Sequence, residues 1–120
     1  MDENRPRPVE RVEELKVGVM WNCDDAQALY AQGVVLHDLG RDDEAIPMLE
    51  RAIMLEPDTP KFRFSLAKSY EAVGDFHGAA NNFLSAYQID RAYTDAINGY
   101  MRVIPKFLAL QSKKSEVGQA

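Results

Sequence analysis

Apolar residues recur three and four positions apart along most of this chain, the spacing that places them on one face of a helix. The stretch "GRDDEAIPMLERAIMLEP", residues 40–57, shows the pattern together with its boundaries. A glycine precedes it, acidic residues open it, an apolar stripe runs through it and Pro57 follows it. These are the usual start and stop signals of a helix. We therefore expect a helix here, capped by Asp42 or Asp43.

The same pattern predicts six helices in all. Pro47 lies close enough to the start of its helix to remove at most one backbone hydrogen bond, whereas Pro105 marks an expected kink. The sequence contains no strand-like alternation of useful length, so the expected fold class is all-α. The predicted helices cover residues 9–22, 26–38, 42–56, 60–73, 75–90 and 94–111.

Several helix ends can be predicted individually. Asp24 or Asp25 is well placed to cap the helix over 26–38, and Asp75 to cap the helix over 75–90. Gly40 and Gly74 each follow a helix, where a residue in the left-handed conformation permits a tight turn. These residues predict two helix pairs of the same design.

Length and charge limit the function further. A chain of 120 residues with 14 basic and 19 acidic side chains is one small, mildly acidic domain, which argues against nucleic acid and anionic membranes as partners. Cys23 is the only cysteine, so no internal disulfide can form. No apolar run reaches membrane length and the start does not resemble a signal peptide. We expect a soluble, cytoplasmic protein.

The chain also matches itself when it is shifted by 34 residues. Large residues meet large ones, small residues meet small ones, and the two turn glycines coincide. The matched pairs are Tyr30/Phe64, Gly33/Ala67, Leu36/Tyr70, Leu39/Val73, Gly40/Gly74, Ala45/Ala79, Leu49/Phe83, Ala52/Ala86, Leu55/Ile89 and Glu56/Asp90. A period of 34 residues built from two helices is typical of the tetratricopeptide repeat, and the chain resembles that family.

This resemblance implies a short, right-handed superhelical array of antiparallel helix pairs with flanking helices. The expected organisation is a flexible arm over 1–8, a single repeat domain over 9–111 and a flexible tail over 112–120. Within the domain, an N-terminal helix (9–22) precedes repeats at 26–59 and 60–93, and a capping helix (94–111) follows them. The family's terminal proline is present as Pro57 in the first repeat and replaced by Arg91 in the second.

In this family the first helix of each pair lines a groove that binds a peptide. Tyr30 and Phe64 would then be apolar anchors, and basic residues would attract carboxylates. This predicts a protein partner bound through a segment with hydrophobic and acidic residues. The alternative interpretation is that the two aromatic rings only pack against neighbouring helices. The residues that the resemblance places on the groove are Gln27, Tyr30, Val34, His37, Asp38, Lys61, Phe64, Ser65, Lys68, Glu71, Asn98 and Arg102.

Two subclasses of the family can be compared with this sequence. The carboxylate clamp of heat-shock cochaperones needs lysine and asparagine where Tyr30 and Val34 stand, so that function is not expected. The segment "PKFRFSLAKSYEAVGDFHGAANNF" bears a weaker resemblance to small chaperones that hold type III secretion translocators. The resemblance as a whole implies an adaptor, assembly factor or chaperone.

The sequence gives no sign of catalysis. His37 and His77 lie in different repeats without a second ligand at metal spacing, and the acids at 42–44 point in different directions on a helix. No nucleophile–base pair, phosphate loop or cofactor motif is recognisable. We expect no enzyme activity, no metal and no cofactor.

The alternative function is self-association as a structural scaffold. A stable array usually needs at least three repeats, and this chain has two with half-units at the ends. A second copy of the chain could cover the apolar positions of the terminal helices, which would give a homodimer. Those positions are Val12, Leu15 and Val19 in the first helix and Phe107, Leu108 and Leu110 in the last.

Overall fold

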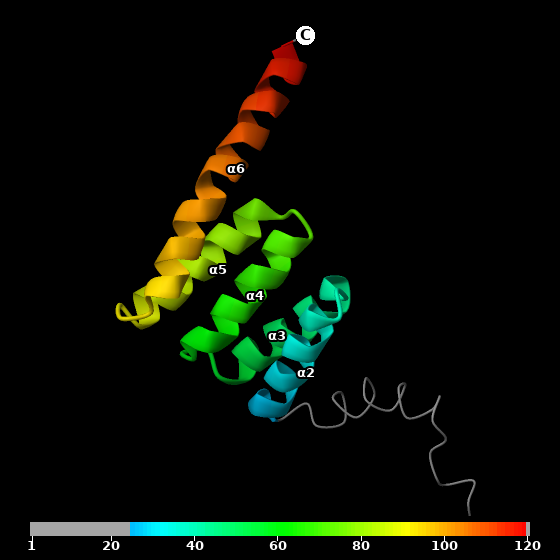
Figure 1. Cartoon of the computed structure of the whole chain (residues 1–120), viewed down its shortest axis with the longest axis vertical. Helices are drawn as coiled ribbons and strands as arrows, with labels where there is room; N and C mark the ends of the chain where they lie inside the picture. The colour runs from blue at the N-terminus through cyan, green and yellow to red at the C-terminus, as the bar shows by residue number, and fades with distance from the viewer. Residues whose placement is uncertain (1–24, 120) are drawn as a thin grey trace, which may run out of the picture.

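The structure, a computed structural model, describes residues 25–119. The expected arm (1–8), the expected helix over 9–22 and Asp24 lie outside the described residues and stay predictions. Within this range the chain is all-α, as expected. The helices, labelled as in Figure 1, are α2 (Ala26–Asp38), α3 (Asp42–Leu55), α4 (Pro60–Ala72), α5 (Phe76–Ile89) and α6 (Thr94–Gln119).

The helices form a layered array in which each packs against the next. α2 pairs with α3, α4 pairs with α5, and α6 packs on α5 (Figure 1). The C-terminal half of α6 extends beyond the other helices (Figure 1). α2 and α4, the first helices of the two pairs, also contact each other directly.

The two pairs end their first helices with the same hydrogen bonds. In α2 the amides of Gly40 and Arg41 donate to the carbonyls of His37 and Leu36, at 2.9 and 2.8 Å. One period later, the amides at 74 and 75 donate to the carbonyls at 71 and 70. Gly40 and Gly74 have φ angles of 77° and 88°, so the left-handed turn predicted from the sequence is confirmed.

The helix starts agree with the predictions at two places and disagree at one. Asp25 accepts a hydrogen bond from the Ala28 amide at 3.1 Å, and Asp75 accepts one from the Gly78 amide at 2.9 Å. The predicted cap of α3 is wrong: position 41 is the N-cap residue and makes no side-chain cap bond. Asp42 is the first helical residue instead, and its carboxylate reaches back to His37 of α2.

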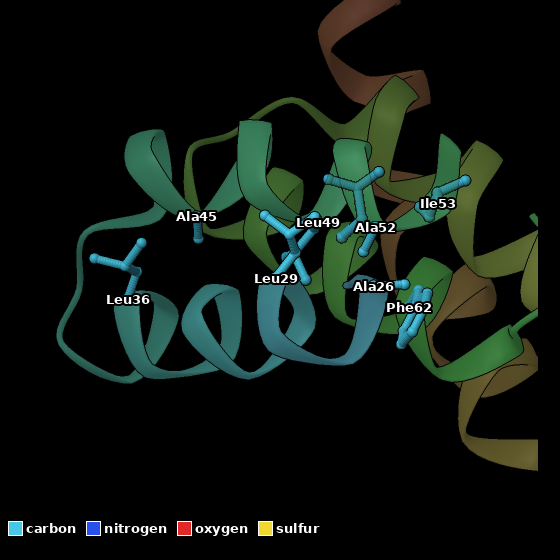
Figure 2. Packing of buried hydrophobic residues seen from close by; sticks show 9 residues of the cluster. Ala26, Leu29, Leu36, Ala45, Leu49, Ala52, Ile53 and Phe62 are labelled. Carbon is cyan, nitrogen blue, oxygen red and sulfur yellow. The ribbon is translucent and has the colours of Figure 1, made fainter. Parts of the chain in front are cut away.

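Two apolar clusters form the core of the array. The first lies between α2 and α3 and includes Leu29, Leu49 and Phe62 of α4, all fully buried (Figure 2). The second lies between α4, α5 and α6 around Phe83 and Val103. Alanines fill the closest helix contacts, because a methyl side chain lets two helix backbones approach. The fully buried alanines of α3 and α5 are Ala45, Ala52, Ala79 and Ala86.

The last helix is longer than the sequence predicted. The expected capping helix ended at residue 111, whereas α6 continues to Gln119. Most of residues 111–117 are good helix formers, which favours continuation of the helix. Pro105 lies inside α6. No helix in the described range 25–119 is long and apolar enough to span a membrane.

Candidate functional site

A pocket of about 180 Å³ lies between α2 and α4. Leu49 of α3 forms its floor, and Tyr93, from the turn between α5 and α6, closes one side. Gly33 is also part of the lining. A side chain at this position would collide with Leu49, because an added Cβ would lie 2.6 Å from the Leu49 Cγ. The lining residues are Tyr30, Gly33, Val34, His37, Asp38, Leu49, Phe64, Ser65, Lys68 and Tyr93.

Aromatic rings give the pocket a firm wall. The Phe64 ring contacts Tyr93 at a centroid distance of 5.1 Å and Phe83 at 5.5 Å. The Tyr30 ring contacts the fully buried Phe62 at 5.0 Å. Tyr30 and Phe64 are both half-buried. They therefore pack against neighbouring residues and also leave part of each side chain on the surface. Packing within the array is thus compatible with a role as anchors for a ligand.

Two lysines of α4 lie on these rings instead of next to carboxylates. The Lys61 ammonium is 5.2 Å from the Tyr30 ring centroid, and the Lys68 ammonium is 5.4 Å from the Phe64 centroid. Both distances are within the range of a cation–π contact. Neither lysine forms an ion pair within the described part of the chain. The pocket edge therefore carries positive charge that no acidic side chain of residues 25–119 neutralises through an ion pair.

A histidine–aspartate pair holds the other end of the pocket. His37 Nδ1 is hydrogen-bonded to Asp42 Oδ1, and the Asp42 side chain is only 9% exposed. Nε2 is therefore the ring nitrogen left for a ligand in the pocket. Asp38 lies beside it and is the acidic residue of the lining. A buried carboxylate thus fixes the orientation of the imidazole.

Glu71 and Arg102 form an ion pair outside the pocket lining. Arg102 donates from Nη2 and Nε to the two Glu71 oxygens at 2.7 and 2.9 Å, and Lys106 Nζ is 3.7 Å from one of them. The hydrogen bonds from Arg102 lower the pKa of Glu71, and the same bonds raise the pKa of Arg102. This pair links α4 to α6, so Arg102 is a neutralised cation.

The structure brings together about half of the residues predicted from the family resemblance. Tyr30, Val34, His37, Asp38, Phe64, Ser65 and Lys68 all line one pocket. Gln27, Lys61, Glu71, Asn98 and Arg102 are outside its lining. A role for any of them in peptide binding stays a prediction.

Sequence reasoning missed three lining residues, of which Tyr93 is the most informative. Burial raises the pKa of its phenol. Tyr93 stands two positions after Arg91, which replaces the family's terminal proline. An aromatic residue in a turn that departs from the family pattern was the signal that could have pointed to it. Gly33 and Leu49 were assigned to the packing of the core, which is also where they lie.

Within the described residues, no group of three or more histidine, cysteine, aspartate or glutamate side chains could hold a metal ion. The site as described offers a recess with a mixed polar and apolar lining, aromatic faces, two cations and one oriented imidazole. These groups suit the binding of a segment of another molecule.

Comparison with known proteins defines the class. Residues 26–59 match the family model of the tetratricopeptide repeat. This range contains α2 and α3, and α4 and α5 repeat the same design one period later. Residues 26–59 therefore match a tetratricopeptide repeat, as the sequence indicated, and the described part of the chain is an all-α helical repeat array.

Two of the proteins to which it is similar are PcrH and VexE. A crystal structure of PcrH in complex with the chaperone binding region of PopD superposes with a TM-score of 0.61 at 22% identity, covering 85% of this chain and 77% of that one. This likeness confirms the fold. The Vi polysaccharide export protein VexE of Salmonella typhi is 23% identical over 97 residues, which are 81% of this chain. The chain spans only 15% of the length of VexE.

Proposed function

We propose that this chain is a non-catalytic protein-interaction module that binds a peptide segment of a partner protein in the pocket between α2 and α4. It would act as an adaptor, assembly factor or chaperone. The observation that carries the proposal is the pocket itself. Residues from two consecutive repeats and the following turn meet around one recess of mixed polar and apolar lining, and two lysines at its edge form no ion pair within residues 25–119.

The arrangement favours binding for an energetic reason. The pocket walls are already held by core residues such as Phe62 and Phe83, so binding does not require the receptor to become ordered. An apolar side chain that fills the recess would contribute about 1.5–3 kcal/mol if fully buried. The PcrH structure, which has a similar fold, contains a region of a second protein, and this supports a peptide ligand here.

Site-specific photocrosslinking in cells of the source organism tests the proposal. A photoreactive amino acid at Val34, which lines the pocket, should form a covalent adduct with a partner protein. The same group at Arg51, exposed on α3 away from the pocket, is the matched control. Adducts at position 34 alone would support the proposal. Adducts at position 51 alone, or equal adducts at both positions, would contradict it.

Self-association is a second candidate function, because α6 exposes large apolar side chains. Met101 is 66% exposed, Leu108 56% and Leu110 47%. A second copy that covered them would gain about 25 cal/mol for each Å² of apolar surface. Sedimentation equilibrium tests this alternative. A wild-type dimer that becomes a monomer when Leu110 is changed to aspartate would support it, and a monomeric wild type would contradict it.

A further inference from the structure

The charges around the pocket are arranged in a way that limits the ligand further. Lys61, Phe64 and Lys68 lie on one face of α4, because residues three, four and seven positions apart share a helix face. Phe64 thus lies between the two lysines along α4. Each ammonium group is held on an aromatic face, at 5.2 Å from the Tyr30 centroid and 5.4 Å from the Phe64 centroid.

The spacing of the two lysines along α4 can be compared with the spacing of side chains in a ligand. Seven residues of α-helix rise about 10.5 Å. An extended peptide advances about 3.3 Å per residue, and its successive side chains point to opposite faces. Carboxylates four positions apart therefore share one face and lie about 13 Å apart, a span that two flexible lysine side chains can cover. The apolar residue that enters the pocket would then lie between them.

The space between the helices favours an extended ligand over a helical one. Cα atoms of α2 and α4 approach within 8 Å of each other, whereas a helix with its side chains is about 10–12 Å wide. The recess has a volume of about 180 Å³, about six times the share of liquid volume taken by one water molecule. That is room for one side chain.

In the described part of the chain, no acidic residue near the pocket forms an ion pair with either lysine. Glu71 is bound to Arg102 and Lys106 of α6, and Asp42 is bound to His37. Asp38 lines the pocket at the His37 end, so a ligand carboxylate is disfavoured there and favoured along α4. Among residues 25–119, the cations at the pocket that form no ion pair are therefore Lys61 and Lys68.

We propose that the pocket selects an acidic, extended peptide segment in which two carboxylate side chains stand four positions apart with one apolar side chain midway between them. The apolar residue enters the recess between Tyr30 and Phe64, and the carboxylates pair with Lys61 and Lys68. This rests on the proposed function, since it names the class of peptide that the same pocket takes.

Selection from a library of random 12-residue peptides displayed on phage tests the inference, with the full chain as the immobilised target. The wild type should enrich peptides that carry Asp or Glu four positions apart, with a Leu, Ile or Phe midway between them. A charge-reversed variant, Lys61→Glu with Lys68→Glu, should lose these peptides by at least tenfold in recovery and should enrich peptides with Lys or Arg at the same spacing. The control, Arg51→Glu with Lys113→Glu, makes the same change in net charge at exposed positions away from the pocket and should select the wild-type motif.

Titration with a synthetic copy of the most enriched peptide, labelled with fluorescein, measures how much each charge contributes to the affinity. Replacing one of its carboxylates by the amide should weaken binding to the wild type about fivefold to tenfold. The neutral variant Lys61→Gln with Lys68→Gln, whose exposed substitutions leave the core untouched, should bind the unmodified peptide at least tenfold more weakly.

The outcomes separate the inference from the proposed function. Enriched peptides without acidic residues, or with acids seven positions apart as on a helix, would overturn the inference and leave peptide binding in place. A wild type that enriches no peptide over the uncoated support would contradict the proposed function and the inference together.

Discussion

The array joins the first helices of its repeats at two places, and equivalent residues produce opposite results there. At the first junction, between α2 and α4, a pocket of about 180 Å³ is open above Leu49. At the second, between α4 and α6, the equivalent of Leu49 is Phe83, 34 positions later. The Phe83 ring presses against Gly99, the equivalent of Ser65. A larger side chain on one helix has thus been matched by a smaller one on the next.

Charge separates the two junctions in the same way. Glu71 and Arg102 bridge the second junction with two hydrogen bonds of 2.9 Å or less. Their equivalents at the first junction are His37 and Lys68, which cannot form an ion pair because neither is acidic. His37 is bound to Asp42 instead, and Lys68 lies on the Phe64 ring. The second junction is closed by its own charges, and the first keeps a cation for a ligand.

Removing the ring that fills the second junction should have the largest effect on stability. Phe83→Ala deletes a fully buried side chain, and such truncations reduce the free energy of unfolding by about 3–5 kcal/mol. Urea denaturation followed by circular dichroism measures it. Met101→Ala, at a position 66% exposed on α6, is the control and should change stability by less than about 0.5 kcal/mol. A loss below about 1 kcal/mol for Phe83→Ala would show that its ring does not fill the second junction.

Adding one methyl group to the same junction should have a smaller effect. An alanine Cβ at Gly99 would lie 2.6 Å from the Phe83 Cε1 atom, and overpacking of this kind costs about 1–3 kcal/mol. Urea denaturation of Gly99→Ala should show a loss in that range.

The first junction supplies the control for this prediction, because Ser65 has a Cβ at the equivalent position and faces a pocket floored by Leu49. Phe83→Leu should therefore make Gly99→Ala tolerable, so that the double variant is at least as stable as Phe83→Leu alone. Additive losses would contradict this explanation of the glycine.

These comparisons also show what the sequence could and could not reveal. The caps at Asp25 and Asp75 and the turns at Gly40 and Gly74 depend on residues within one turn of each other, so local patterns were sufficient to predict them. Side-chain hydrogen bonds between different helices could not be predicted from such local patterns. The cap predicted for Asp42 failed because its carboxylate bonds a side chain of the previous helix.

The candidate site was predictable only as far as the repeat extends. The period of 34 placed Tyr30 and Phe64 on a common face, and both line the pocket. Tyr93 belongs to the turn where the second repeat departs from the family pattern, so the register gave it no role. The Glu71–Arg102 pair joins residues 31 positions apart, and no local pattern distinguishes such a paired arginine from an unpaired one.

Breaking the bridge of the second junction should have the smallest effect on stability. Glu71→Gln removes a partly exposed ion pair, which is worth about 0.2–1 kcal/mol. The Arg102 hydrogen bonds lower the pKa of Glu71 below its ordinary value of 4.5. A carboxylate with a lowered pKa in the folded state contributes stability above its unfolded pKa, and this contribution is lost as the pH falls through the folded pKa.

Urea denaturation of the wild type and of Glu71→Gln at a series of pH values checks this. The wild type should be more stable at pH 7, and the difference should disappear as the pH falls from about 4.5 through the lower pKa of the folded state. A difference that stays constant over this range would mean that the ion pair is not its source.

The most direct test of the contrast compares Lys68→Ala with Arg102→Ala, which remove equivalent cations from the two junctions. Fluorescence anisotropy with the most enriched acidic peptide measures the Kd of each variant and of the wild type. If the first junction is the binding site, Lys68→Ala should raise the Kd about fivefold to tenfold. Arg102→Ala should change it less than twofold, because its charge is already used by Glu71. An equal or larger effect of Arg102→Ala would contradict the assignment of the binding site to the first junction.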